Sequence, residues 1–296
     1  MDPEGDVPVT ETRLPAGTRL RAFADLARIH FLPVWPLVFC SGLALAAEVY
    51  GGFTAGLVLN DYIDRDLDRR DVSASFSRYW RPFGTRPIPS GTVKPWEALA
   101  LFLGLVAAAA ALALTFPWPR PAWLIGLGLY SYAVEAFYQV AKRRQRFPAA
   151  QLVGRTDFAL FPVAGYLCLG FPDTLALRFF LAFYPWTLVH LGVNDLADLE
   201  NDRARGLATI PVLYGTRGTA AWIGGWAALH LLLGAFFYPL LGPVPLAAWL
   251  AASLLLVIVA GKILADPTPQ RGLAMLPVLH LSLLISSLGI LAGAVL

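Results

Sequence analysis

The sequence predicts an all-α membrane protein, a polytopic bundle of about eight to nine transmembrane helices. Of its 296 residues, 57% are hydrophobic and only 15% are charged, whereas roughly a quarter of the residues in soluble domains are charged. The apolar residues fall in long runs, most of them near the roughly 20 residues that a helix needs to cross a bilayer. One membrane bundle therefore explains a length that would otherwise allow two soluble domains.

The N-terminal residues 1–24 are predicted to be a flexible cytoplasmic tail, followed by one transmembrane domain over residues 25–296. The tail is polar and lacks the basic-then-apolar pattern of a cleaved signal peptide. The first apolar run extends from Phe31 to Asn60, which is too short for two full spans. Two short segments with a turn near Gly51, or one span and a partial hairpin, both remain compatible with this run.

Seven further apolar runs are predicted to be spans. They cover residues 97–116, 121–138, 155–171, 174–194, 219–241, 244–264 and 273–296. This arrangement divides the loops between the two sides of the membrane. Of the 23 Lys and Arg residues, only Arg120 and Arg178 fall in loops on the side away from the acidic stretches described below. The opposite, cation-rich side is therefore predicted to be cytoplasmic by the positive-inside rule.

Two acidic stretches follow apolar runs and share the pattern N-D-x-x-D-x-x-x-D. The first extends from Asn60 to Asp68 and the second from Asn194 to Asp202. On a helix, positions i, i+3 and i+7 point within one narrow sector, so each stretch presents three aspartates on one face. These are Asp61, Asp64 and Asp68 in the first stretch, and Asp195, Asp198 and Asp202 in the second.

The two acidic stretches are separated by four predicted spans, so both are expected at the cytoplasmic side. Carboxylates at this density repel one another unless a cation binds between them. Mg²⁺ prefers oxygen ligands, and water and phosphate oxygens usually complete its coordination. The alternative is that each stretch is a solvated charged loop. Because the pattern recurs beside membrane spans, we interpret it as a site for Mg²⁺ and a diphosphate.

Cations for the remaining diphosphate oxygens are expected on the same side of the membrane. The candidates are Arg65 inside the first stretch, Arg203 and Arg205 at the end of the second, and Lys142 and Arg143 between them. Arginine suits bidentate contact with phosphate, and lysine acts as a point charge. For the basic run that begins at Lys142, anchoring by the positive-inside rule is the competing interpretation.

Ionisable residues inside the predicted spans are few and are functional candidates by default. Those that stand out are Glu48, Glu135, Asp157, His190, His230 and His280. For the histidines, the preferred interpretation is hydrogen bonding inside the bundle. His190 also lies one turn before Asn194 and is therefore expected to face the same cavity. Arg155 and Asp157, near a span entrance, either line the site or lie at the membrane interface.

At these residues the chain resembles the UbiA superfamily of intramembrane prenyltransferases, over most of its length. Residues 60–68 are similar to the first aspartate-rich motif of that family, and residues 86–91, R-P-I-P-S-G, resemble its R-P-L-P-S-G segment. Tyr138 to Lys142 matches the Y-x-x-x-K element. Residues 195–215 resemble the second aspartate-rich motif and the G-x-x-T-x-P-V tail beyond it.

The resemblance implies a UbiA-type helical bundle, usually of nine spans, with a central cavity open sideways to lipid, in which Mg²⁺ holds an isoprenyl diphosphate. The implied metal ligands are Asn60, Asp61, Asp64, Asp68, Asp195, Asp198 and Asp202. The implied diphosphate-binding residues are Asn60, Arg65, Tyr138, Lys142, Arg143, Asn194 and Arg203. The implied catalytic residues, which promote loss of the diphosphate, are Asp64, Asp68, Lys142, Asp198 and Asp202.

Two features depart from the family pattern. The region before Asn60 is shorter than the two full spans of the family, which weakens any assignment of acceptor contacts there. The interval of residues 70–85 is longer than the pattern requires and is predicted to be either a lid over the diphosphate or a disordered insert.

The predicted function is prenyl transfer from a polyprenyl diphosphate to a lipophilic or aromatic acceptor, as in quinone, chlorophyll, haem or ether-lipid biosynthesis. The protein is expected among membrane lipids, with its active site facing the cytoplasm and no nucleic acid partner. A membrane terpene cyclase, which ionises the diphosphate without an external acceptor, is the alternative.

Two other classes of membrane protein are disfavoured. A divalent-cation transporter would need acidic residues near mid-membrane, whereas these lie at one end of the spans. A CDP-alcohol phosphotransferase would need a D-G and A-R pattern inside one motif, and neither acidic stretch has it.

Overall fold

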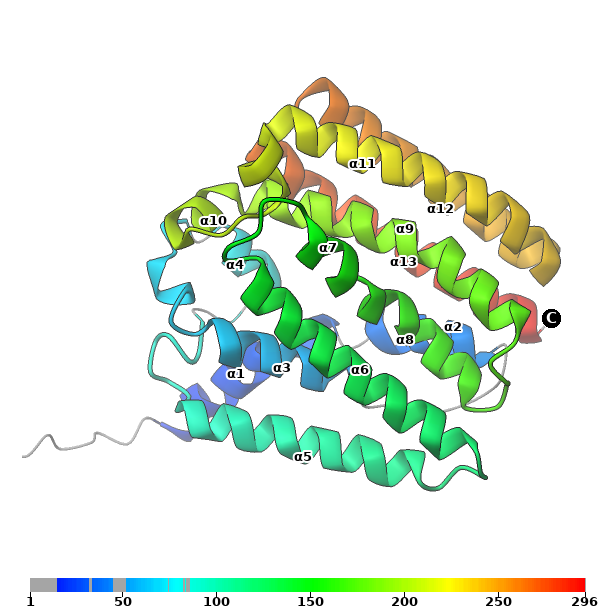
Figure 1. Ribbon diagram of the computed structural model, residues 1–296, viewed down its shortest axis with the longest axis horizontal. Coiled ribbons are helices and arrows are strands. Elements are labelled where there is room, and N and C mark those ends of the chain that lie inside the picture. Colours follow the sequence, from blue (N-terminus) through cyan, green and yellow to red (C-terminus); the bar gives the residue numbers. More distant parts are fainter. Residues whose placement is uncertain are drawn as a thin grey trace, which may run out of the picture.

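The computed structural model describes residues 15–31, 34–44, 52–73, 75–81, 83 and 86–295. Every regular element within these residues is a helix (Figure 1). The long helices lie side by side, and the turns that join them gather at the two ends of the bundle. The prediction of an all-α helical bundle is therefore confirmed.

The seven apolar runs predicted after the first acidic stretch are all helical. Among the described residues, five helices are long and apolar enough to cross a membrane. These are α5 (Pro95–Ala113), α9 (Thr174–Ala197), α11 (Ile210–Phe237) continued by η3 (Tyr238–Leu241), α12 (Pro243–Ala265) and α13 (Pro269–Val295). The other two runs correspond to α6 (Arg120–Ala141) and the shorter α8 (Thr156–Leu167), which follows α7 (Ala149–Gly154).

Local sequence chemistry explains where several helices begin. Pro95 occupies the first turn of α5, where a missing N–H costs nothing, and the Glu97 carboxylate accepts a hydrogen bond from the Lys94 N–H at 2.9 Å. Asp173 accepts hydrogen bonds from two backbone N–H groups in the first turn of α9, both at 2.9 Å. Pro243 begins α12 in the same way as Pro95 begins α5.

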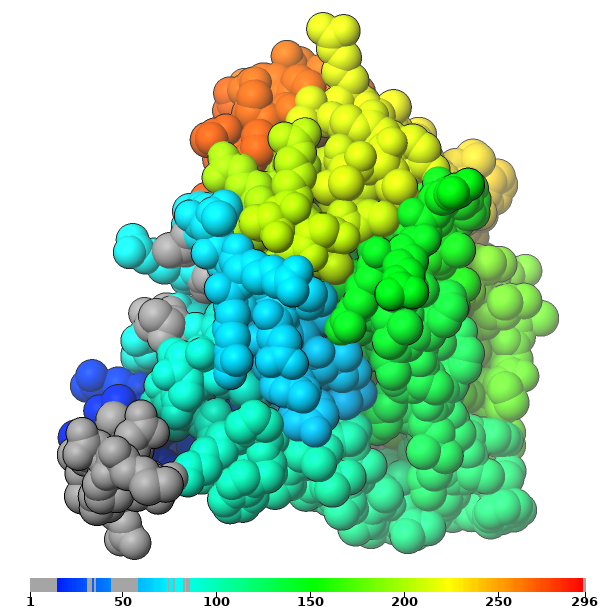
Figure 2. Space-filling view, turned by 60° about the vertical axis from the view of Figure 1, so that its left-hand side comes forward, coloured from blue at the N-terminus to red at the C-terminus, as the bar shows by residue number. Residues whose placement is uncertain are grey.

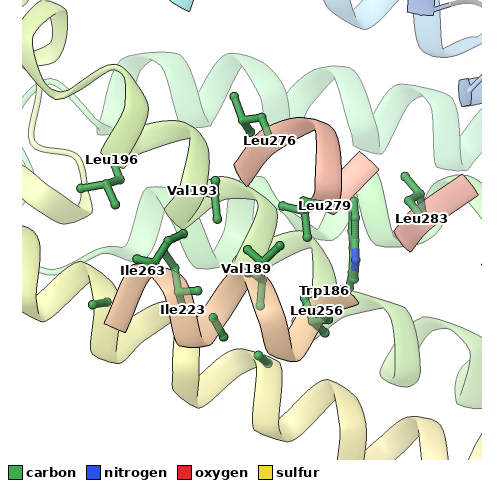
Figure 3. Close-up of a cluster of buried hydrophobic side chains, with 14 of the residues drawn as sticks. Trp186, Val189, Val193, Leu196, Ile223, Leu256, Ile263, Leu276, Leu279 and Leu283 are labelled. Atoms are coloured by element: carbon green, nitrogen blue, oxygen red, sulfur yellow. The ribbon is translucent and has the colours of Figure 1, made fainter. Parts of the chain in front are cut away.

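The largest hydrophobic core lies between α9, α11, α12 and α13. Figure 3 shows branched aliphatic side chains from these helices packed in one group together with Trp186. Burial of such side chains supplies the main favourable term in packing. The buried residues labelled there are Trp186, Val189, Val193, Leu196, Ile223, Leu256, Ile263, Leu276, Leu279 and Leu283. Of these four helices, α9 contributes residues to the lining of the cavity described below.

Two helices follow the N-terminal region, and the second of them carries the start of the first acidic stretch. They are α2 (Val34–Ala44) and α3 (Gly52–Asp64). Both are much shorter than a full span, in agreement with the limited length of this part of the sequence. The turn that was considered near Gly51, and Glu48, lie outside the described residues.

The region expected to be a tail contains helix α1 (Ala16–Leu26). Ala22 and Leu26 are buried against Val58 and Val93. Residues 16–24 are therefore helical and not part of a flexible tail, because these apolar contacts hold the helix against the bundle. Residues 1–14 lie outside the described part of the chain.

The contact between α2 and α8 depends on two glycines. A Cβ atom at Gly42 would lie 1.7 Å from the carbonyl oxygen of Pro162, and one at Gly165 would lie 2.1 Å from that of Phe39. Because the blocking atoms belong to the backbone, only a shift of a whole helix would make room for a side chain. The two glycines therefore allow α2 to lie directly against α8.

We predict that Gly165→Ala destabilises the protein by about 1–3 kcal/mol through overpacking, measured as a lower melting temperature in detergent. Gly104→Ala on α5 is the matched control, since a Cβ there meets nothing within 4 Å. The control should leave the melting temperature unchanged or raise it, because alanine favours helix by up to about 1 kcal/mol over glycine. Equal melting temperatures for the two variants would contradict the close contact.

Candidate active site

The helices line a half-open cavity of about 410 Å³ that is polar at one end and apolar at the other. Its wall follows α6 from Leu124 to Lys142, a rise of about 27 Å at 1.5 Å per residue. Around Lys142 the lining consists of acidic and basic side chains from both aspartate motifs. Around Leu124 it consists of apolar side chains from α5, α6 and α8, including Val106 and Ala164, and of Phe116 from the turn after α5. The cavity thus joins an ionic compartment to an apolar channel.

The first acidic stretch reaches the cavity at the end of α3 and in the 3₁₀ turn η2 (Asp68–Arg70). Asp64 is 5% exposed and accepts a hydrogen bond from the Lys142 ammonium at 2.8 Å. Asp68 is equally buried and forms an ion pair with Arg86. Asn60 donates a hydrogen bond to Glu135 at 2.9 Å. Both predicted aspartates therefore line the cavity, although they are buried in its wall and do not face bulk solvent.

Asp61 is held by two arginines that were not among the predicted site residues. Arg81 Nη2 lies 2.6 and 2.7 Å from the two carboxylate oxygens of Asp61, and Arg28 Nη2 lies 3.0 Å from one of them. Asp61 and Arg81 are both almost fully buried. The role of Asp61 as a metal ligand stays a prediction, and these two ion pairs compete with it.

The second acidic stretch occupies the end of α9 and helix α10 (Leu199–Arg205). Arg205 lies between the motifs: its Nη1 is 3.2 Å from Asp198 and 3.7 Å from Asp202, and its Nη2 is 3.8 Å from Asp68. It also forms an ion pair with Asp71. One buried guanidinium thereby joins both acidic stretches. In Figure 2 the segments that follow the two motifs meet on one face, in blue and yellow-green, beside the green end of α6.

Asn194, the first residue of the second stretch, belongs to a chain of hydrogen bonds. The Asn194 amide lies 3.1 Å from His190 Nδ1, His190 Nε2 lies 3.0 Å from His280 Nε2, and His280 Nδ1 lies 2.6 Å from the Tyr79 hydroxyl. His230 bonds to the Ala182 carbonyl at 2.8 Å. The three histidines therefore hydrogen-bond inside the bundle, as expected, and His190 also lines the cavity.

The interval after the first motif is packed against the second one. Asn201 accepts hydrogen bonds from the backbone N–H groups of Val72 and Ser73, both at 2.9 Å. The short helix α4 (Ser75–Trp80) follows, and both Trp80 and Arg81 line the cavity. The described part of this interval therefore packs against the second motif and contributes to the cavity wall.

The structure places some predicted residues away from the cavity lining. Arg203 is exposed, and Arg65 stacks on the Tyr62 ring with its guanidinium carbon 4.8 Å from the ring centroid. Arg143 lies behind Asp64, with Nη2 at 3.5 Å from its carboxylate. In contrast, Tyr138 and Asp195 line the cavity, as do the predicted aspartates and asparagines other than Asp61.

Five further cations line the cavity: Arg28, Arg81, Arg86, Arg155 and Arg205. Arg205 is among the cations expected to face the diphosphate, and Arg155 was expected either in the site or at the interface, whereas Arg28, Arg81 and Arg86 were not predicted as site residues. Arg205 lies three residues after Asp202 and seven after Asp198, so it continues the acidic face of the helix. The approach of Arg28 and Arg81 to Asp61 depends on how distant segments fold back, which residue spacing does not reveal.

Burial makes ionisation less favourable for three aspartates of the ionic compartment. Burial raises the pKa of Asp68 and of Asp198, and burial together with the neighbouring Asp198 and Asp195 raises the pKa of Asp202 well above its usual value. Burial alone would lower the pKa of Arg205, but Asp198 and Asp68 more than offset that effect and raise it. A further cation in the compartment would favour the ionised carboxylates.

The donor atoms fit Mg²⁺ when a diphosphate completes its coordination. Among the described residues, no three His, Cys, Asp or Glu side chains converge closely enough to hold a metal by themselves. Mg²⁺ in proteins usually takes one or two carboxylates, with waters and substrate phosphates filling the remaining positions. Asn194 Oδ1, which is buried and lacks a hydrogen-bond partner, offers one more neutral oxygen at the cavity wall.

Taken together, the fold and the cavity define an α-helical membrane protein with two aspartate motifs facing one ionic compartment. A sequence model of the UbiA prenyltransferase family matches residues 26–287. The chain therefore belongs to the UbiA prenyltransferase family, as its motifs predicted.

Among curated relatives, the protoheme IX farnesyltransferase of Aquifex aeolicus is 32% identical over 185 residues, which cover 62% of this chain and 56% of that protein. The 4-hydroxybenzoate octaprenyltransferase of Ectopseudomonas mendocina is 33% identical over 242 residues, which cover 76% of this chain and 74% of that protein. The chain thus spans little more than half the length of the Aquifex enzyme.

Solved structures share the fold at lower sequence identity. A structure of digeranylgeranylglyceryl phosphate synthase in membranes superposes with a TM-score of 0.66 at 18% identity, covering 94% of this chain and 99% of that one. A UbiA homologue from Archaeoglobus fulgidus bound to DMAPP and Mg²⁺ gives a TM-score of 0.59 at 15% identity, covering 93% and 99%. These comparisons confirm a UbiA-type fold.

We predict that Arg205→Gln destabilises the protein by about 3–5 kcal/mol, because it leaves buried carboxylates without their counter-ion. Arg203→Gln is the matched control, since Arg203 is an exposed neighbour on the same helix and should change stability by at most about 0.5 kcal/mol. Thermal unfolding in detergent with EDTA measures both. Similar unfolding temperatures for the two variants would show that Arg205 does not join the motifs.

Proposed function

We infer that this protein is a Mg²⁺-dependent prenyltransferase that moves a prenyl group from a polyprenyl diphosphate to a lipophilic or aromatic acceptor. The observation that carries this proposal is the single cavity in which both aspartate motifs face an ionic compartment continuous with an apolar channel. A prenyl diphosphate has the same two-part chemistry, a highly charged head and an apolar tail. Family membership and the relatives named above support the same reaction class.

The ionic compartment would bind the diphosphate head. Asp64, Asp68, Asp198 and Asp202 are the proposed metal-facing carboxylates, together with Asn60 and Asp195. When bound, Mg²⁺ would neutralise the diphosphate and make it a better leaving group. Lys142 reaches the compartment as a compact positive charge, with its ammonium 2.8 Å from Asp64 and 4.8 Å from the Tyr138 ring centroid. Such a fixed cation stabilises the charge that develops on the departing diphosphate.

The apolar channel would hold the prenyl tail and keep water from the reacting carbon. Aromatic rings lie where the two parts of the cavity join, including Phe158, Tyr138 and Trp80. The faces of such rings stabilise a nearby cation, which is what loss of diphosphate from an allylic carbon produces. The excess of Lys and Arg in the loops on the motif side supports an orientation with this compartment facing the cytoplasm.

We predict that Asp64→Ala or Asp198→Ala abolishes Mg²⁺-dependent pyrophosphate release from geranyl, farnesyl or geranylgeranyl diphosphate in detergent with a membrane lipid extract. Both residues line the cavity. Asp66→Ala and Glu200→Ala are matched controls within the same motifs, because these two side chains are exposed. The controls should retain activity within about threefold of the wild type.

The same assay separates the alternative functions. Release that requires the lipid extract identifies a transferase, whereas release without it and with a hydrocarbon product identifies a terpene cyclase. Full turnover in Asp64→Ala or Asp198→Ala would contradict the assignment of these residues to a metal site. If the wild type releases no pyrophosphate from any of the three diphosphates, the proposed prenyltransferase function is contradicted.

We predict that Gly128→Leu shortens the prenyl chain that the enzyme accepts. Gly128 lines the apolar channel, and a Cβ there meets nothing within 4 Å, so a larger side chain would project into the channel without displacing the backbone. With geranylgeranyl diphosphate the rate should fall by about fivefold or more, since overpacking costs about 1–3 kcal/mol. Geranyl diphosphate should be affected less.

Gly126→Leu is the control for this channel experiment. Gly126 lies two residues away on α6, also has open space around it, and does not line the cavity. It should leave the preference between the two diphosphates unchanged. An identical shift in both variants would show that the preference does not arise from filling the channel.

A further inference from the structure

Part of the cavity wall is not used by the proposed diphosphate site. Arg155 and Asp157, at the start of α8, line the cavity together with Glu135 of α6. They lie where the ionic compartment meets the apolar channel, since Phe158 and Tyr138 are their neighbours. Charged side chains at such a position are costly unless a partner or a ligand compensates them.

Arg155 differs from the other cations of the cavity. Arg28, Arg81, Arg86, Lys142 and Arg205 each lie within 4.0 Å of a carboxylate. Within the described part of the chain, Arg155 forms no such ion pair. Its guanidinium carbon instead lies 5.4 Å from the Tyr138 ring centroid and 4.6 Å from that of Phe158, and its buried Nε has no hydrogen-bond partner. The charge of Arg155 is therefore available to a ligand.

The two acids beside Arg155 have spare acceptor capacity. Asp157 accepts a hydrogen bond from the backbone N–H of Phe158 at 2.5 Å, and no other described residue donates to it. Glu135 receives two hydrogen bonds, from Asn60 and Gln139, and both go to the same oxygen. A carboxyl group offers more acceptor sites than these hydrogen bonds use, and both side chains line the cavity.

We propose that Arg155 and Asp157 form the acceptor subsite, in which Arg155 binds an anionic oxygen group of the acceptor and Asp157 accepts a hydrogen bond from its hydroxyl. This inference rests on the proposed prenyltransferase function and specifies the acceptor class. A ligand with both groups satisfies both side chains. Arg155 lies beside Phe158 and Tyr138 at the junction with the apolar channel, and among the described residues it is not paired with an aspartate of either motif, which is why the guanidinium is assigned to the acceptor. The thiodiphosphate measurement below tests the alternative, that Arg155 binds the donor.

The proposal predicts two chemical requirements for the acceptor, a hydroxyl group and a carboxylate or phosphate. Two probes separate the two possible anions: 4-hydroxybenzoate, a phenol with a carboxylate, and glycerol 1-phosphate, an alcohol with a phosphate. Equilibrium dialysis of each probe against purified protein would be done with Mg²⁺ and geranyl thiodiphosphate present. This analogue occupies the donor site and ionises very slowly, so binding is measured without turnover.

We expect at least one probe to bind the wild type. Arg155→Gln should weaken that binding by about tenfold or more, the effect of losing one charge-assisted hydrogen bond. Asp157→Asn should weaken it by a smaller factor, since the amide keeps one acceptor oxygen. Binding of geranyl thiodiphosphate should change by less than about threefold in both variants.

Controls separate a specific effect from misfolding. Arg144→Gln removes an exposed cation from the loop after α6 and should leave binding of probe and thiodiphosphate unchanged. Arg155→Lys keeps the charge and should retain more probe binding than Arg155→Gln. Thermal unfolding of each variant confirms that it is folded before binding is compared.

Three results would overturn the proposal. The first is that neither probe binds the wild type when geranyl thiodiphosphate is bound, and the second is that Arg155→Gln leaves probe binding unchanged. The third is a tenfold loss of thiodiphosphate binding in Arg155→Gln, which would assign the guanidinium to the donor. If the wild type fails to bind thiodiphosphate with Mg²⁺, the proposed prenyltransferase function fails and the acceptor subsite fails with it.

Discussion

The burial of opposite charges at one end of the helical bundle is the constraint on which the rest of the structure depends. Asp68, Asp198 and Asp202 lie in the cavity wall around Arg205, a single guanidinium that joins segments more than 130 residues apart in the chain. Carboxylates in a low-dielectric setting are unfavourable without counter-charges. The bundle must therefore bring its cations to the same place, and Lys142, from the end of α6, is one of them.

This constraint explains why the two parts of the cavity adjoin. The helices that carry the acidic stretches, α3 and α9, are mostly apolar before their last turns, so the carboxylates gather at one end of the bundle. Beyond that end, α5, α6 and α8 meet mainly through apolar side chains and leave a channel between them. A ligand with a charged head and an apolar tail matches this arrangement, and the same geometry brings Arg155 and Asp157 to the junction between the two parts.

Much of the fold and part of the site were predictable from residue patterns. Apolar runs of nearly 20 residues predicted the helices after Asn60, and the repeated spacing predicted that Asp64, Asp68, Asp198 and Asp202 would share one compartment. The same helical spacing favours Arg205 over Arg203. The pairing of Asp61 with Arg81 was not predictable, because it depends on how the interval after η2 folds back. The contact made by Gly42 and Gly165 likewise depends on the approach of two helices.

We propose that the two aspartate motifs together hold one metal–diphosphate complex. A crystal structure with Mn²⁺ and geranyl thiodiphosphate would locate the metal by the anomalous scattering of manganese. We expect anomalous density between the end of α3 and α10, with oxygens of Asp64 or Asp68 and of Asp198 or Asp202 as nearest protein ligands, directly or through water. Bound thiodiphosphate with no metal there, or metal held by one motif alone, would contradict it.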